Sequence, residues 1–257
     1  MRYDMAIAGS GAAAFAAAIA ARACGHSVVM AERADVGGTC VNTGCVPSKA
    51  LLAAAGARHA ALRHRFPGVG TDAGPLDFPA LIAGKDELVS AMRQGKYLEL
   101  AEEYGWRIIP GQARFVPGPR LEVAVRDGAT ELIDAAHYLV ATGSAPWVPP
   151  IPGLRRAGYL TTADAAALDE VPPSLIVLGG GAAGLEQSQL FAHLGAQIVL
   201  VEALDRLAPF DEPEISAAVG DIFADEGIRV HTATQVSSVS RDESGHVVAA
   251  ALASSRA

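Results

Sequence analysis

The sequence has 257 residues, 51% of them apolar and 19% charged, which is enough to bury one large core or two modest ones. Lys and Arg number 20 against 28 Asp and Glu, giving a formal net charge of -8 with no basic run, which argues against a nucleic-acid partner. No stretch approaches the ~20 apolar residues of a membrane span, and no signal peptide is recognisable, so we expect a cytoplasmic protein without membrane contact.

The first elements in the chain predict a nucleotide-binding unit. Residues 3–8 are typical of a strand, and a glycine turn, an alanine-rich helix and a second strand ending at Glu32 follow. Gly9 allows a tight turn, Gly11 lets backbone approach a pyrophosphate, and Ala14 permits close packing of helix on strand. Free N–H groups at the helix N-terminus favour phosphate, and Glu32 can accept hydrogen bonds from a ribose hydroxyl. A single motif of this kind also occurs for purely structural reasons.

Two cysteines five positions apart follow in the run GGTCVNTGCVPSK, residues 37–49. Structural zinc usually takes four ligands, and here no second Cys or His pair follows and the seven histidines show no ligand spacing. Five residues of helix rise about 7.5 Å, beyond the ~7 Å limit for a disulfide, so one ideal helix cannot carry both cysteines. Pro47 suits the first turn of a helix, which places Cys45 near a helix N-terminus, where thiolate is favoured. The pair is therefore more typical of thiol-disulfide exchange than of a structural bridge.

The middle of the chain predicts a helical stretch over residues 79–104, then short strands at 107–109, 121–126 and 138–141. Residues 146–153 contain enough proline to exclude regular structure, and we place a domain boundary there.

The order of the first unit returns after this boundary. A strand over residues 174–178 leads into Gly179, Gly181 and Gly184, then a helix through His193, and a strand over 197–201 that ends at Glu202. The acid follows the first glycine by the same offset in both units, since 32 minus 9 and 202 minus 179 are each 23. Two copies in the same context predict an α/β fold with two Rossmann-like, doubly wound dinucleotide-binding units, over residues 1–150 and 151–257.

The run of residues 37–49 resembles the active-site signature of the flavin-dependent pyridine nucleotide-disulfide oxidoreductases. Other motifs stand in the order of this family: the G-x-G-x-x-A turn, an Ala-Thr-Gly turn at residues 141–143, and a G-x-G-x-x-G-x-E motif that ends at Glu186. The likeness extends to about residue 245. Val41, Val46 and residues 95–115 and 201–209 are most similar to the mercuric reductases of this family.

The resemblance implies FAD in the first unit, NADPH or NADH in the second, and a redox pair formed by Cys40 and Cys45. Cys45 would lie nearest the flavin, Cys40 would be the interchange thiol, and Lys49 would pair with Glu186 beside the flavin. The residues implied to line the two cofactor sites are Gly9, Gly11, Ala14, Glu32, Gly38, Thr39, Lys49, Ala113, Thr142, Gly143, Gly179, Gly181, Gly184 and Glu202.

The substrate implied by the mercuric reductases is Hg(II), a soft cation that Cys40 and Cys45 would bind before its reduction to Hg(0). In a dihydrolipoamide dehydrogenase the same pair would exchange with a lipoyl disulfide. A carboxylate at Glu202 favours NADH because it repels a 2′-phosphate, whereas mercuric reductases are described as NADPH enzymes and Arg206 keeps NADPH open. A regulatory flavoprotein or a flavin monooxygenase would also have two nucleotide motifs but would be indifferent to replacement of Cys45 by Ser.

Members of this family are longer than 257 residues. We therefore expect an incomplete second unit, an absent C-terminal dimerisation domain, and a homodimer for the full-length enzyme. The chain alone should bind FAD weakly and turn over poorly. Residues 247–257, rich in Ala and Ser, are not expected to finish the sheet.

Overall fold

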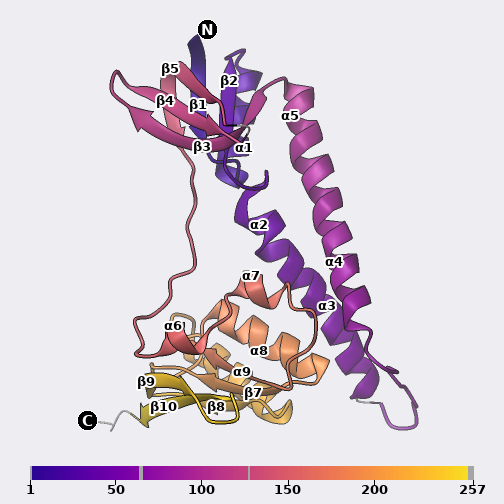
Figure 1. Cartoon of the computed structure of the whole chain (residues 1–257). Helices are drawn as coiled ribbons and strands as arrows, with labels where there is room; N and C mark the ends of the chain where they lie inside the picture. The colour runs from indigo at the N-terminus through magenta and orange to yellow at the C-terminus, as the bar shows by residue number, and fades with distance from the viewer. Residues whose placement is uncertain (1, 64–65, 127, 254–257) are drawn as a thin grey trace. The chain divides into compact units, whose positions relative to one another are not determined.

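The chain consists of two compact units in a computed structural model that describes residues 2–63, 66–126 and 128–253 (Figure 1). The first unit comprises Met1–Pro47 and Gly84–Ala145, and the second comprises Ser48–Ala83 and Pro146–Ala257. Helices α3 (Cys45–Leu62) and α4 (Phe78–Arg93) contribute residues to both units. Within the described residues, none of the helices combines the length and apolar character that crossing a membrane requires.

The first unit is built on a sheet that closes on itself. Its strands are β1 (Arg2–Ala8), β2 (Val28–Glu32), β3 (Arg107–Val116), β4 (Arg120–Val125) and β5 (Thr130–Val140). Strand β1 lies between β2 and β5 and is parallel to both, and β2 is parallel to β3. Strand β4 then joins β3 to β5 in antiparallel pairing, which closes the ring in the order β1-β2-β3-β4-β5. The end of β1 and most of β2 are consequently buried on both faces, as a continuous apolar run predicts.

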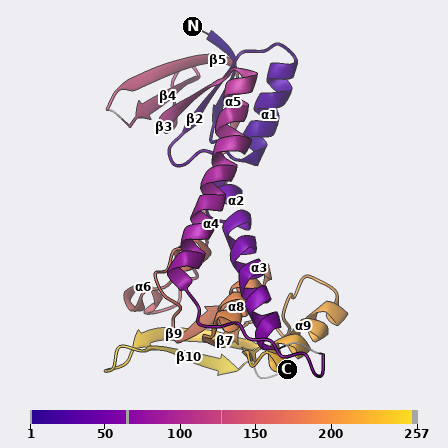
Figure 2. The same cartoon turned by 90° about the vertical axis from the view of Figure 1, so that its right-hand side faces the viewer.

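Helices cover the outer face of the parallel strands in this unit (Figure 2). They are α1 (Ala12–Ala23) and α5 (Glu99–Tyr104), joined by Tyr97 of the π-helical turn η1 (Gln94–Leu98); the short α2 (Gly38–Asn42) also belongs to this unit. Ala14 and Ala18 of α1 are fully buried, because their small side chains let the helix approach the sheet. The buried ring of Phe15 meets Tyr97 and Trp106 edge-on, at centroid distances of 4.8 and 5.2 Å.

The second unit has a three-stranded parallel sheet and a separate hairpin. Its elements are α6 (Leu154–Ala157), α7 (Thr162–Ala165), β6 (Ser174–Leu178), α8 (Ala182–Leu194), β7 (Gln197–Val201), α9 (Pro213–Asp225), β8 (Arg229–His231), β9 (Thr234–Arg241) and β10 (Val247–Ala253). The parallel strands lie in the order β6-β7-β8, and β9 pairs antiparallel with β10. The core is formed by α8 and β7 with Leu51 and Ala55 of α3, and Phe191 and Leu200 are almost completely buried.

The predicted elements are confirmed with shifted ends. Strand β6 and strand β7 have the predicted bounds, and residues 146–153 have no helix or strand. The predicted helical stretch is interrupted by the π-helical turn η1, which the sequence pattern did not indicate. Strands β3 and β5 are much longer than predicted, because each pairs with a parallel neighbour at one end and with β4 at the other. Residues 247–253 form strand β10, which pairs with β9 outside the parallel sheet, so this stretch does not extend that sheet; residues 254–257 lie outside the described residues.

Candidate functional site

The turn after β1 requires glycine for two separate reasons. Gly9 has φ +103°, and a Cβ built there would lie 2.2 Å from the backbone oxygen of Ala141. The Ala141 N–H also donates to the Ala8 carbonyl at 2.8 Å. The turn containing Thr142 and Gly143 is therefore seated against the first glycine loop, which the sequence predicted only as a separate motif.

The glycines that precede the cysteines contact the same loop through backbone atoms. A Cβ on Gly38 would lie 2.7 Å from the Cα of Gly11, so the two chain segments meet where neither has a side chain. The Gly37 N–H donates to the Ser10 carbonyl and to Ser10 Oγ, at 3.1 and 3.2 Å. The nucleotide loop thus fixes the start of the segment that carries the cysteines.

The two acids occupy equivalent positions in the two units. Glu32 accepts a hydrogen bond from Ser10 Oγ at 2.6 Å and another from the Ala34 N–H at 2.8 Å. Glu202 accepts from the Gly180 N–H at 2.5 Å and from the Leu204 N–H at 2.7 Å. Each carboxylate therefore accepts one hydrogen bond from the residue that follows the first glycine of its loop. It accepts a second from the backbone N–H two positions after the acid itself. This repeated geometry holds a negative charge at the tip of the second strand, beside each glycine loop.

The N-termini of α1 and α8 are suited to an anion. Their N-cap residues are Gly11 and Gly181, both with extended backbone, and in the described part of the chain no side chain caps either helix. Gly184 provides close packing at the second loop, since a Cβ there would lie 1.9 Å from the Gly179 oxygen. Glycine-lined backbone, uncapped N–H groups and an adjacent acid fit a dinucleotide in each unit.

The cysteine segment breaks its helix as the spacing predicts. Helix α2 ends at Asn42 and α3 begins at Cys45, while a Cβ on Gly44 would lie 3.0 Å from the Thr39 oxygen. Both cysteines are exposed and in the thiol form, and a hydrogen bond joins the Cys40 and Cys45 thiols. This hydrogen bond, followed by partial burial, raises the pKa of Cys40 above the usual thiol value. Two thiols within hydrogen-bonding reach of each other can bind one soft ion or be oxidised to a disulfide.

Three side chains around the cysteines were not predicted as site residues. Asn42 donates from Nδ2 to the Val36 and Gly38 carbonyls, at 3.0 and 2.9 Å, and accepts from Arg93 Nε at 2.8 Å. Burial raises the pKa of the Tyr97 hydroxyl, and the nearby Cys40 and Cys45 sulfurs raise it further. Asn42 lies inside the cysteine run and Tyr97 inside the family-like residues 95–115, so both positions carried a signal in the sequence, whereas Arg93 lies in an ordinary helical stretch and carried none.

The second unit brings Lys49 and Glu186 together. Lys49 Nζ lies 2.5 Å from Glu186 Oε1, and the two side chains are 60% and 33% exposed. An ion pair this accessible contributes little to stability, so its position rather than its energy is the informative feature. Its part in catalysis stays a prediction.

Ala113 is placed in the core of the first unit. It lies on β3 opposite Val123 and is packed against the buried cluster that includes Ile109 and Leu121. Thr39 lies within α2, and its carbonyl accepts from the Thr43 N–H at 2.9 Å. Their predicted contact with a cofactor stays a prediction.

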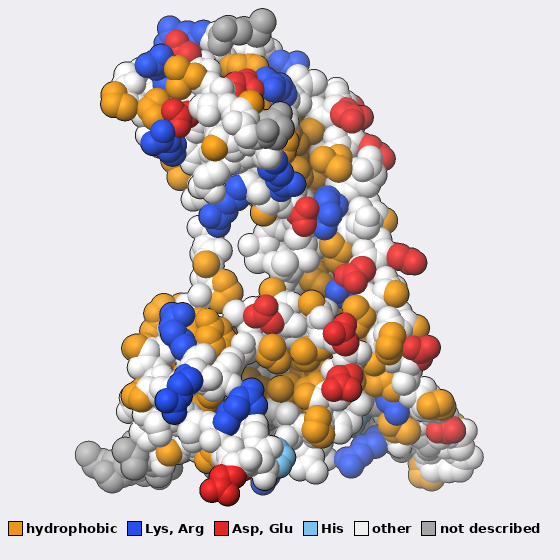
Figure 3. Space-filling view, viewed as in Figure 1, with side chains coloured by type: hydrophobic (Ala, Val, Ile, Leu, Met, Phe, Trp, Pro, Cys, Tyr) orange, Lys and Arg blue, Asp and Glu red, His pale blue; other side chains and the backbone are white. Residues whose placement is uncertain are grey.

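An apolar cavity of about 230 Å³ lies beside Glu186 in the second unit. Hydrophobic side chains are visible on the surface of this unit near α8 (Figure 3). The cavity is lined by Leu52, Leu185, Glu186, Gln189, Val219, Ile222 and Phe223.

Two glycine-loop units and a contacting pair of thiols define a dinucleotide-binding redox protein. A family model described as pyridine nucleotide-disulphide oxidoreductase matches residues 3–256, and the chain belongs to this family. The family resemblance of the cysteine run and glycine motifs is thereby confirmed.

The curated relatives include mercuric reductases. The chain is 59% identical over 244 residues to the mercuric reductase of Streptomyces lividans, covering 95% of the chain and 51% of the relative. It is 44% identical over 228 residues to that of Lysinibacillus sphaericus, covering 89% of the chain and 41% of the relative. A dihydrolipoyl dehydrogenase of Chlorobaculum tepidum is 36% identical over 247 residues, covering 95% of the chain and 52% of the relative. The chain therefore spans about half the length of these relatives.

Solved structures show the same fold. The Cu(II) complex of the HOCl-induced flavoprotein disulfide reductase RclA from Escherichia coli has a TM-score of 0.82 at 27% identity, covering 98% of this chain and 55% of that one. LpdA from Mycobacterium tuberculosis has a TM-score of 0.83 at 25% identity, covering 95% and 56%.

Proposed function

We propose that the chain belongs to an enzyme that reduces Hg(II) to Hg(0) with NAD(P)H, by way of FAD and the pair Cys40 and Cys45. The observation that carries the proposal is the contacting dithiol in a chain 59% identical to a mercuric reductase. In the overall reaction NAD(P)H and Hg(II) give NAD(P)⁺, H⁺ and Hg(0), so the hydride supplies both electrons.

The first unit, within residues 1–150, is proposed to hold FAD. Gly9 and Gly11 would bring backbone to the pyrophosphate, the N-terminus of α1 would face its charge, and Glu32 would accept from the ribose. When bound, FAD supplies a two-electron relay between nicotinamide and thiols. The contact of Gly11 with Gly38 supports this placement, because it connects the loop to the segment of Cys40.

The part of the second unit that spans residues 151–257 is proposed to hold the nicotinamide nucleotide, with NADH preferred. Glu202 is only 7% exposed and keeps its carboxylate at the glycine loop, where it would repel a 2′-phosphate. Arg206, the residue that keeps NADPH open, donates to the Pro209 carbonyl at 2.8 Å and lies 3.5 Å from Ser216 Oγ. Its guanidinium is thus already engaged within its own loop.

The thiols are proposed to bind Hg(II) as a bis-thiolate, releasing their two protons. Two electrons then convert the bound ion to Hg(0) and leave two thiolates. The raised pKa of Cys40 favours its thiol form before the metal binds, so metal binding releases its proton. Cys45 is the first residue of α3, so both sulfurs lie where α2 ends and α3 begins.

A dihydrolipoamide dehydrogenase is the second candidate, favoured by the 36% identity to the Chlorobaculum tepidum protein. The test is oxidation of NADH and NADPH by the FAD-reconstituted protein, with Hg(II) in excess thiol compared with lipoamide and glutathione disulfide. We expect the Hg(II) rate to exceed the disulfide rates and to vanish in Cys40→Ser and Cys45→Ser. Because the result is the ratio of the rates with two substrates, it can be read even when both rates are low. A higher rate of NAD(P)H oxidation with lipoamide than with Hg(II) would favour the dihydrolipoamide dehydrogenase. An unchanged rate in Cys45→Ser would reject both candidates.

A further inference from the structure

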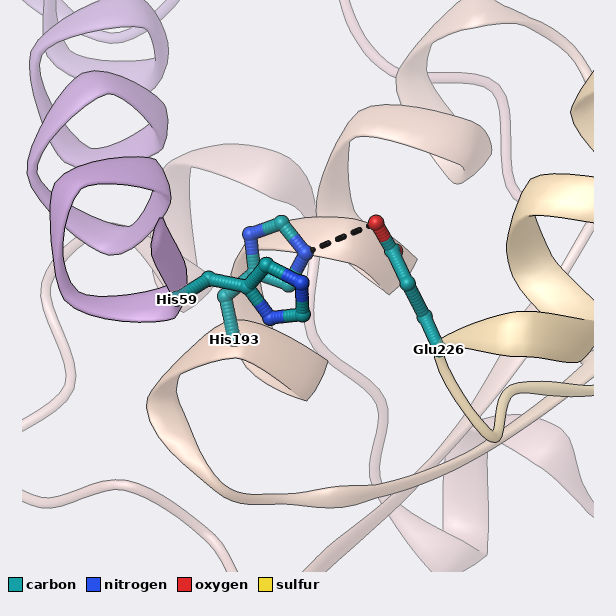
Figure 4. A group of neighbouring side chains, drawn as sticks. All are labelled: His59, His193 and Glu226. Atoms are coloured by element: carbon teal, nitrogen blue, oxygen red, sulfur yellow. Dashed lines mark ion pairs between the residues drawn. The ribbon is translucent and has the colours of Figure 1, made fainter. Parts of the chain in front are cut away.

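Three side chains far apart in the sequence meet within the second unit. His59 comes from α3, His193 from the last turn of α8, and Glu226 from the residue that follows α9 (Figure 4). One ligand atom from each lies within 4.8 Å of the others. The sequence analysis found no ligand spacing among the histidines, because this grouping is made by the fold rather than by a motif.

Two side chains of this group, His193 and Glu226, leave one ring nitrogen without a hydrogen bond in the described part of the chain. The side chains of His193 and Glu226 are only 9% and 13% exposed, and His193 Nε2 lies 3.1 Å from Glu226 Oε1. That approach does not have the angles of a hydrogen bond, so Nε2 has no hydrogen-bond partner among the described residues. A buried ring nitrogen without a hydrogen-bond partner is costly, and here a carboxylate lies beside it, so a cation shared by the two would satisfy the nitrogen.

A metal ion meets this requirement. Ligands at about 2.0–2.1 Å in a tetrahedral site are about 3.3 Å apart, close to the observed separation of His193 from Glu226. Gln189 Nε2 donates to both carboxylate oxygens of Glu226 at 3.1 Å, as an orienting residue behind a metal ligand does. Two imidazoles and one carboxylate form a donor set that zinc uses, with its fourth position open to water.

We propose that His59, His193 and Glu226 bind one Zn²⁺ ion. The ion would tie α3 to α8 and to the end of α9 within the second unit. The rings of His59 and His193 are now stacked, 3.9 Å between centroids and 18° between planes. Parallel rings cannot direct both lone pairs at one point, so the ring of His59, which has no ion-pair contact with Glu226, turns out of the stack when zinc binds. The site differs from the dithiol in donor chemistry, since imidazole and carboxylate suit zinc and thiolates suit mercury.

The test is a zinc titration of the whole chain, with Cys24, Cys40 and Cys45 replaced by Ser so that thiolates do not compete. Calorimetry and competition with a chromogenic chelator would measure the stoichiometry and Kd. We expect one Zn²⁺ per chain, and a zinc-dependent rise in Tm. His59→Gln and Glu226→Gln should lose this ion, and Gln189→Ala should raise Kd about 10–100-fold. The matched control is His231→Gln, which removes an exposed histidine of β8 in the same unit and should leave Kd unchanged.

Folding is checked separately, since His193 is buried and its replacement carries more risk than that of His59. Circular dichroism would compare each variant with the control, and Co²⁺ absorption would report tetrahedral coordination. Zinc binding that His59→Gln and Glu226→Gln leave as strong as in His231→Gln would overturn the proposal. Absence of a stoichiometric ion in the Ser-substituted chain would overturn it equally.

Discussion

Gly9→Ala should destabilise the first unit by two effects that the structure separates. The φ of +103° makes a side chain unfavourable by about 1–2 kcal/mol. The new Cβ would also lie 2.2 Å from the Ala141 oxygen, so that turn must move by about 1 Å to reach ordinary contact. Overpacking of this kind costs a further 1–3 kcal/mol or so, giving a total loss of about 2–5 kcal/mol.

The matched control is Gly25→Ala. Gly25 has φ +81° in the same unit, but a Cβ there would meet nothing within 4 Å. It should therefore show the backbone effect alone, about 1–2 kcal/mol. The difference between the two variants measures the collision with Ala141.

The assay is urea unfolding followed by tryptophan fluorescence. Trp106 is buried in the first unit and Trp147 is exposed in the second, so a Trp147→Phe background restricts the signal to the first unit. Equal losses of unfolding free energy for Gly9→Ala and Gly25→Ala would refute the reasoning, because the turn at Ala141 would then not be in tight contact with Gly9.

Three further predictions concern the thiols and the two acids. In the FAD-free chain, alkylation of Cys40 should have its pH midpoint above that of an ordinary thiol, because the raised pKa favours the thiol form, and Cys45→Ala, which removes the hydrogen-bond partner, should lower that midpoint; a midpoint unchanged by Cys45→Ala would contradict the hydrogen bond. Glu202→Gln should shift the ratio of NADH to NADPH affinity about tenfold toward NADPH, measured by nucleotide titration, because it removes one charge beside the loop. An unchanged ratio would show that this acid does not face the ribose. Lys49→Met should cost less than about 1 kcal/mol in urea unfolding, because its ion pair with Glu186 is accessible to water, and a larger loss would give the pair a structural role.

The sequence predicted the glycine loops, acids and broken cysteine helix because each is a local pattern. Glu32 and Gly44 have roles set by neighbours within about two dozen residues, whereas the contact of Gly9 with Ala141 joins distant parts of the chain. From the sequence, the contact of Gly11 with Gly38 could be predicted only as far as the two motifs being near each other. A contact between two residues without side chains requires glycine at both positions but gives no pattern that pairs them.

The remaining features depend on where elements pack. Arg93 reaches Asn42 across 51 positions of chain, and its own surroundings are those of an ordinary helix end. The grouping of His59, His193 and Glu226 likewise requires three helices to be placed first. Closure of the β1–β5 ring depended on the length of β3 and β5, which their short apolar segments understated.

The backbone contact between Gly11 and Gly38 couples ligand binding at the glycine loop to ligand binding at the cysteine segment. No side chain stands between the loop and the cysteine segment to absorb a displacement, so a ligand that orders one also orders the other. By thermodynamic reciprocity, a nucleotide that changes the affinity of Cys40 for a metal has its own affinity changed by the same factor when the metal binds. Occupancy of either ligand could thus be read from the other, with no second conformation of the fold required.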